Sequence, residues 1–103
     1  MKKISHKFSH DGLHSVYLLV DLAFNNLRVN TSAKPYDALL FVAIVRLRMR
    51  LSKILLFKFA KKSISFGWDE FFAVMIAFER FPNLGVYETV VIQEFLTEGG
   101  KKI

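Results

Sequence analysis

The feature that most restricts the fold is a long stretch without residues that break helices or form turns. Between Ala38 and Lys62 there is no glycine, proline, asparagine or aspartate, the residues that usually separate one strand from the next. Within it, RLRMRLSK (residues 46–53) alternates basic and apolar residues as a half-buried strand would. The preceding apolar run does not alternate, and a strand of the whole segment would greatly exceed the usual length of about 5–6 residues. We therefore favour a helix here, with a strand as the alternative.

Apolar residues at spacings of three and four predict three further helices. One runs from about Leu13 to Leu27, one follows Gly67 in WDEFFAVMIAFERF, and one follows Pro82, with Asn83 as its cap and Gly99 and Gly100 as its end. The β-branched residues of YETVVIQEF leave a strand open as an alternative there. The sequence thus predicts an all-α fold, a compact array of about four helices with a long central second helix and one short extended segment near residues 62–66.

The chain length of 103 residues fits a single domain, residues 1–103. We interpret residues 1–10 as a mobile, basic N-terminal arm. His6, His10 and His14 recur at a spacing of four, which on one helical face could bind a transition metal. Such a helix would pass through Ser9 and Gly12 close to a chain terminus, where fraying is the rule. We therefore expect no metal site and no cofactor.

Charge and composition narrow the class of protein. The net charge is +6, but residues 1–67 carry twelve Lys and Arg against three Asp, whereas residues 68–103 carry three basic against six acidic residues. The absence of cysteine excludes disulfides and is typical of a reducing compartment. The longest apolar run, residues 38–45, is much shorter than the ~20 residues of a membrane-spanning helix. We expect a soluble, cytoplasmic protein without a membrane partner.

Basic residues cluster in the middle of the chain, where Lys or Arg occupies seven of the seventeen positions from Arg46 to Lys62. Such a cluster can bind phosphates, and Phe57 and Phe59 could stack on bases. The alternative is a solvated helix face that pairs with acids such as Asp69, Glu70 or Glu79. Arg48 projects among apolar neighbours, which predicts a buried or interface charge with a carboxylate partner. The predicted nucleic-acid or acidic-partner binding residues are Arg46, Arg50, Lys53, Lys58, Lys61 and Lys62.

No residue pattern indicates catalysis. None of the serines lies in a GxSxG context, and the glycines form no phosphate-binding loop. We expect a small non-enzymatic interaction or assembly protein that oligomerises with itself or docks on another protein through apolar helix faces and complementary basic and acidic surfaces. The alternative is a basic nucleic-acid-binding protein that uses the Arg46 to Lys62 face, with Lys2, Lys3 and Lys7 as an auxiliary arm. Size and composition would also suit an accessory protein of a phage or mobile element.

Overall fold

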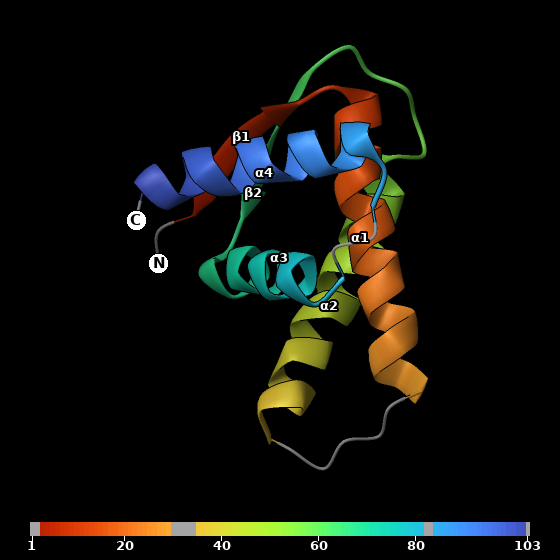
Figure 1. The fold of residues 1–103 in the computed structure, drawn as a ribbon. Coiled ribbons are helices and arrows are strands. Elements are labelled where there is room, and N and C mark those ends of the chain that lie inside the picture. The colour runs from red at the N-terminus through yellow and green to blue at the C-terminus, as the bar shows by residue number, and fades with distance from the viewer. Residues whose placement is uncertain (1–2, 30–34, 82–83, 103) are drawn as a thin grey trace.

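The computed structural model describes residues 3–29, 35–81 and 84–102. In this part of the chain it contains four helices and one two-stranded antiparallel sheet (Figure 1). In chain order the elements are β1 (Ile4–Phe8), α1 (His10–Val29), α2 (Pro35–Ile54), β2 (Lys62–Phe66), α3 (Trp68–Arg80) and α4 (Val86–Lys101). The predicted extended segment is confirmed as β2, but β1 was missed, so the all-α prediction holds only in part.

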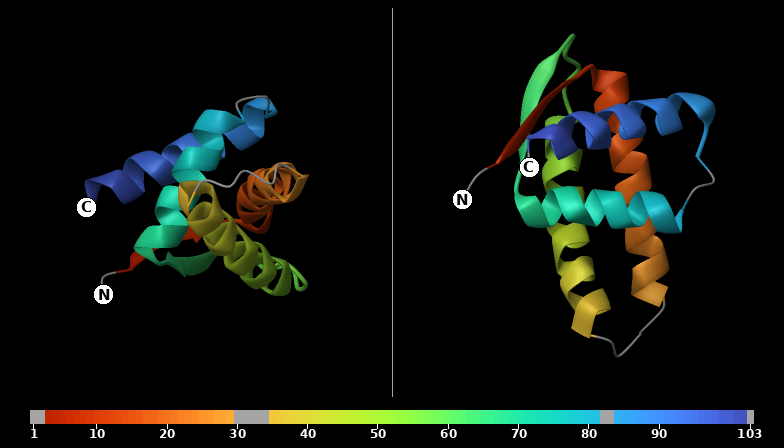
Figure 2. Two further views of the ribbon diagram at one scale, coloured as in Figure 1. Left: turned by 90° about the horizontal axis from the view of Figure 1, so that it is seen from below. Right: turned by 60° about the vertical axis from the view of Figure 1, so that its left-hand side comes forward.

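The helices form two crossed pairs. α1 and α2 lie side by side, and α3 and α4 run across one face of this pair (Figures 1 and 2). The prediction of a central second helix is wrong, because α1 packs against α2, α3, α4 and β1, whereas α2 packs mainly against α1 and α3. The two helices are also equally long, at 20 residues each. None of the helices in the described ranges is long and apolar enough to cross a membrane.

The segment RLRMRLSK lies within α2, so the helical prediction is confirmed. The helix ends earlier than the lack of breakers suggests, at Ile54. The ring of His10 makes a hydrogen bond of 3.1 Å between Nε2 and the carbonyl oxygen of Leu55, at the end of the helix where carbonyl groups need partners. The chain must then reach β1, because residues 62–66 pair with residues 4–8. A tertiary contact from His10 thus provides a partner for a carbonyl group at the point where α2 ends.

Strand β1 forms because its alternate side chains share one buried face. Ile4 and Phe8 are almost fully buried, and Ile4 pairs with Phe66 in β2. On the opposite face the hydroxyl oxygens of Ser5 and Ser65 lie 2.9 Å apart. The expected arm at residues 1–10 is therefore an ordered strand over residues 4–8.

Helix α4 closes the core over the sheet. The ring of Phe95 lies 5.3 Å from Phe8, 4.8 Å from Phe66 and 5.4 Å from Phe71, measured between centroids. The predicted end of this helix at Gly99 and Gly100 is wrong, because α4 continues through both glycines to Lys101. Its predicted cap, Asn83, lies outside the described residues.

Gly99 has a packing role instead of a terminating one. A Cβ atom at this position would lie 2.4 Å from Cε2 of Phe71, whose side chain is buried, whereas a Cβ at Gly100 would meet no atom within 4 Å. The absence of a side chain at Gly99 thus allows α4 to approach α3 closely.

We predict that Gly99→Ala lowers the free energy of unfolding by about 1–3 kcal/mol, because the methyl group must displace a buried ring. Gly100→Ala is the matched control and should be neutral or slightly stabilising, since alanine favours a helix over glycine. Urea denaturation of both variants measures the difference. Equal stability of Gly99→Ala and the wild type would contradict the close approach of α3 and α4.

Candidate functional site

The predicted binding residues divide into two groups. Arg46 reaches from α2 to α3, where its Nη1 lies 2.9 Å from Oδ2 of Asp69. The Nη2 of Arg50 lies 3.3 Å from Oε1 of Glu70. Both carboxylates belong to the first turn of α3, where negative charge also complements the helix dipole. Both arginines are therefore paired with acids of α3, as the alternative of pairing with nearby acids predicts, although the Arg46–Asp69 pair lies at the surface.

Arg50 is the more enclosed of the two. Its guanidinium lies 5.4 Å from the ring centroid of Phe66, and its Nε and Nη2 atoms are buried. Neither atom has an aligned hydrogen-bond partner among the described residues. Glu70 is itself 5% exposed and accepts a 2.8 Å hydrogen bond from the backbone N–H of Gly67. Arg50 is therefore poorly placed to bind an external phosphate.

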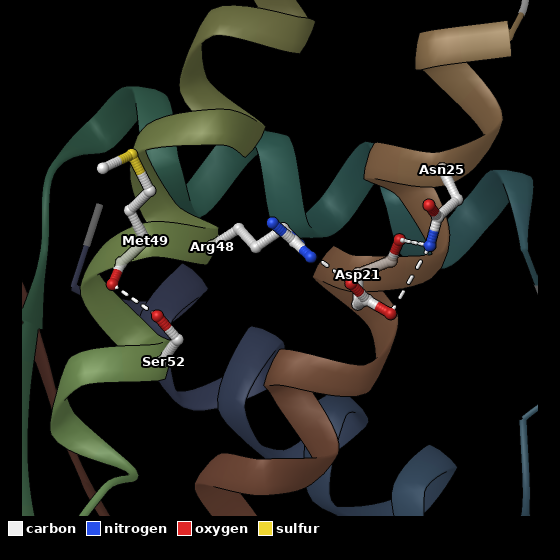
Figure 3. A network of polar contacts seen from close by, with 5 residues as sticks. All are labelled: Asp21, Asn25, Arg48, Met49 and Ser52. Atoms are coloured by element: carbon white, nitrogen blue, oxygen red, sulfur yellow. Dashed lines mark hydrogen bonds and ion pairs between the residues drawn. The ribbon is translucent and has the colours of Figure 1, made fainter.

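Arg48 has the carboxylate partner that its position on α2 predicts. Its Nε donates a 2.8 Å hydrogen bond to Oδ1 of Asp21 on α1 (Figure 3). The guanidinium also lies 4.3 Å from the ring centroid of Phe24. The hydrogen bond to Asp21 raises the pKa of Arg48 above its usual value. Asp21 interrupts the apolar stretch of residues 16–24, and this interruption is the sequence signal that could have identified it as the partner.

The remaining predicted residues form a different surface, which we call the lysine loop: residues 55–61, with Lys53 and Lys62 at its two ends. It is the green loop at the top of Figure 1, between α2 and β2. Lys53, Lys58, Lys61 and Lys62 are exposed. In the part of the chain that the structure describes, none of them forms an ion pair with a carboxylate.

Strand β1 adds a fifth lysine beside the loop. Lys7 is opposite Ser63 in the sheet register, and it lines a hollow of about 190 Å³ together with Lys61 and Glu94. Lys3 precedes the other end of β1 and is not part of this cluster, and Lys2 lies outside the described residues. Of the residues in the expected auxiliary arm, Lys7 is the one that the structure places beside the lysine loop.

The two phenylalanines of the lysine loop have different environments. Phe59 packs inward, with its ring centroid 5.0 Å from that of His10 and with Nζ of Lys62 5.9 Å from it. Phe57 is 79% exposed, and the neighbouring Leu56 is 73% exposed. Sequence periodicity could not distinguish them, because the loop follows neither a helical nor a strand repeat.

The outer face of α2 carries further exposed apolar residues. Leu39, Val42 and Met49 are 73%, 56% and 54% exposed, and they share this face with Arg46 and Lys53, opposite the buried Ile44 and Leu47 side. Figure 3 shows the side chain of Met49 pointing away from α1. We define the outer face of α2 as Leu39, Val42, Arg46, Met49 and Lys53.

The three histidines do not meet. His6 packs against the rings of Phe8 and Phe95, His10 contacts Leu55 and Phe59 as described above, and His14 stacks on Tyr17 with 6.2 Å between ring centroids. Burial lowers the pKa of His6, and the carboxylates of Glu94 and Glu98 partly oppose this. No group of three or more residues that could hold a metal ion occurs within the described ranges.

Comparisons with protein-family models, with curated proteins and with solved structures find no match for this chain. The candidate site therefore rests on the geometry of the chain itself.

The contribution of the contact between Arg48 and Asp21 to stability can be measured directly. We predict that a double-mutant cycle of Asp21→Asn and Arg48→Gln gives a coupling energy of about 0.5–1 kcal/mol in urea denaturation, because both side chains are about one-third exposed. The same cycle of Glu98→Gln and Lys101→Gln, a more exposed pair, should give a smaller coupling energy. A coupling energy near zero for Asp21 and Arg48 would show that α1 and α2 do not depend on this pair.

Proposed function

We propose that this protein is a small non-enzymatic interaction protein that forms a two-fold symmetric dimer through the outer face of α2. The observation that carries the proposal is the row of exposed apolar side chains on this face. Leu39, Val42 and Met49 each expose more than half of their surface, although apolar residues are common enough in this chain to fill the core. Exposed apolar side chains gathered on one face of a helix support a contact with another protein.

The charges on the outer face are compatible with contact between two copies. Arg46 lies near the middle of the face and pairs with Asp69, and the two side chains are 59% and 48% exposed. In an antiparallel pair of α2 helices, a two-fold axis near Arg46 would bring the pair from one copy against the same pair from the other. Positive and negative groups could then alternate across the axis. Two-fold dimers, the commonest homo-oligomers, require such self-complementary surfaces.

The size of the outer face of α2 determines the expected affinity of the dimer. One helix of 20 residues is about 30 Å long, and one face of it offers less area than the ~800 Å² per partner of a standard interface. We therefore expect a dimer that dissociates in the micromolar range.

Sedimentation equilibrium over about 1–500 μM protein tests this proposal. The average mass of the wild type should rise with concentration from 11.9 kDa toward twice that value. Val42→Glu should abolish the rise, because a two-fold contact would bury this carboxylate in both copies. Val90→Glu is the control, since Val90 on α4 is 55% exposed, almost the same as Val42, and should leave the dimer intact.

A strict monomer over the whole concentration range would contradict the dimer. So would equal weakening by Val42→Glu and Val90→Glu, because it would indicate a general effect of charge.

The alternative of nucleic-acid binding has weaker support. Of the predicted residues, Arg46 and Arg50 are paired with α3, which leaves Lys53, Lys58, Lys61 and Lys62. These exposed lysines are suited to an anionic partner. The exposed apolar side chains of the same loop bear on which kind of partner that is.

A further inference from the structure

We propose that the lysine loop docks on the surface of an anionic lipid bilayer, with Leu56 and Phe57 inserted between headgroups and the lysines in contact with lipid phosphates and carboxylates. The proposed dimer and this docking surface share Lys53, but they use different apolar residues, so the failure of one leaves the other testable.

The loop exposes two large apolar side chains, Leu56 and Phe57, directly after the end of α2. On either side of them, Leu55 and Phe59 pack against the core. His10 fixes both flanks, since its Nε2 is 3.1 Å from the carbonyl oxygen of Leu55 and its ring is 5.0 Å from that of Phe59. With these flanks held, Leu56 and Phe57 point outward and are 73% and 79% exposed. The fold therefore holds them at the surface.

Exposed lysines occur on both sides of Leu56 and Phe57 along the chain. Lys53 and Lys58 flank these two residues, and Lys61 and Lys62 follow where the loop enters β2. Lys7 lines the same hollow as Lys61. The one carboxylate in that hollow, Glu94, leaves a clear excess of positive charge. Each lysine near an anionic lipid surface adds to binding, while apolar side chains gain from entering the interface.

The side chains of Leu56 and Phe57 favour lipid over nucleic acid as the partner of the loop. Single-stranded nucleic acid is held by successive bases stacked on aromatic rings, but in the described part of this loop only Phe57 presents an open ring, because Phe59 is covered by His10 and Lys62. Leu56 is as exposed as Phe57 and has no ring to stack on a base. An aliphatic side chain gains as much as an aromatic one from burial among acyl chains.

This inference revises the expectation of no membrane partner. That expectation rested on the lack of a spanning segment, and no helix of the described chain could cross a bilayer. Docking on a bilayer surface needs no such helix, only apolar side chains at the interface and cations near the headgroups.

Vesicle sedimentation with the full chain tests the proposal. At about 100 mM salt, where charges remain incompletely screened, the protein should pellet with phosphatidylcholine vesicles that contain phosphatidylserine and not with pure phosphatidylcholine vesicles. Lys61→Gln should lower the partition coefficient about five-fold, and Leu56→Ser with Phe57→Ser should lower it at least about ten-fold. The fluorescence of a Phe57→Trp variant should be quenched by brominated acyl chains beyond the quenching of Trp68 in the wild type.

Two matched controls separate the loop from bulk properties. Lys3→Gln removes the same charge at the other end of β1, and Val86→Ser removes an apolar side chain that is 83% exposed on α4; neither should change the partition coefficient by more than two-fold.

Three results would overturn the proposal. They are no sedimentation with anionic vesicles, equal losses for Lys61→Gln and Lys3→Gln, and tighter binding of a mixed-sequence single-stranded oligonucleotide at the same salt that Lys61→Gln abolishes. The last result would assign the loop to nucleic acid.

Discussion

The buried carboxylate of Glu70 is the group on which the junction of three elements depends. It accepts the backbone N–H of Gly67 at the start of α3 and faces the guanidinium of Arg50 on α2, which in turn lies over Phe66 at the end of β2. A buried charge is tolerated only when it is paired and hydrogen-bonded. Glu70 satisfies this requirement through a side chain and a backbone group from different elements. This junction thus links the start of α3 to α2 and to the end of β2.

Pairing with carboxylates separates the arginines from the lysines of this chain. Four of the five arginines in the described residues form ion pairs with carboxylates on other helices. A planar guanidinium suits such contacts, because it can stack on a ring while donating to a carboxylate, as Arg48 does with Phe24 and Asp21. The lysines of the loop have no such partners among the described residues. In the described residues four of the arginines thus pair with carboxylates across helices, whereas the lysines of the loop are exposed to solvent.

The sequence predicted the elements whose signals are local. The helical identity of RLRMRLSK, the start of α3 after Gly67 and the extended segment at residues 62–66 all followed from periodicity and from the placement of turn residues. Strand β1 could not be predicted, because ISHKF shows only two strongly apolar residues and gains its stability from pairing with a segment almost sixty residues away. The end of α4 was misplaced, because Gly99 and Gly100 lie inside the helix, where Gly99 packs against Phe71.

The candidate site was predicted in its residue types but not in its organisation. Sequence reasoning grouped Arg46 and Arg50 with the lysines and kept pairing with acids such as Asp69 or Glu70 as the alternative, because a helical projection does not show where α3 lies relative to α2. It did predict that Arg48 needs a carboxylate. It could not show that Leu56 and Phe57 are exposed, since that depends on how His10 holds the residues around them.

The structure holds Arg48 and Arg50 against carboxylates of other helices, and this arrangement is central to the division between arginines and lysines. NMR measurement of hydrogen exchange at the arginine Nε–H groups tests it most directly. We predict slow exchange of the Nε–H of Arg48, which donates to Asp21, and of the Nε–H of Arg50, which is buried. Arg28 is exposed at the end of α1 and should exchange quickly. Exchange of Arg48 and Arg50 at the rate of Arg28 would show that these two side chains are not held by contacts within the fold. They would then be available to bind an external partner.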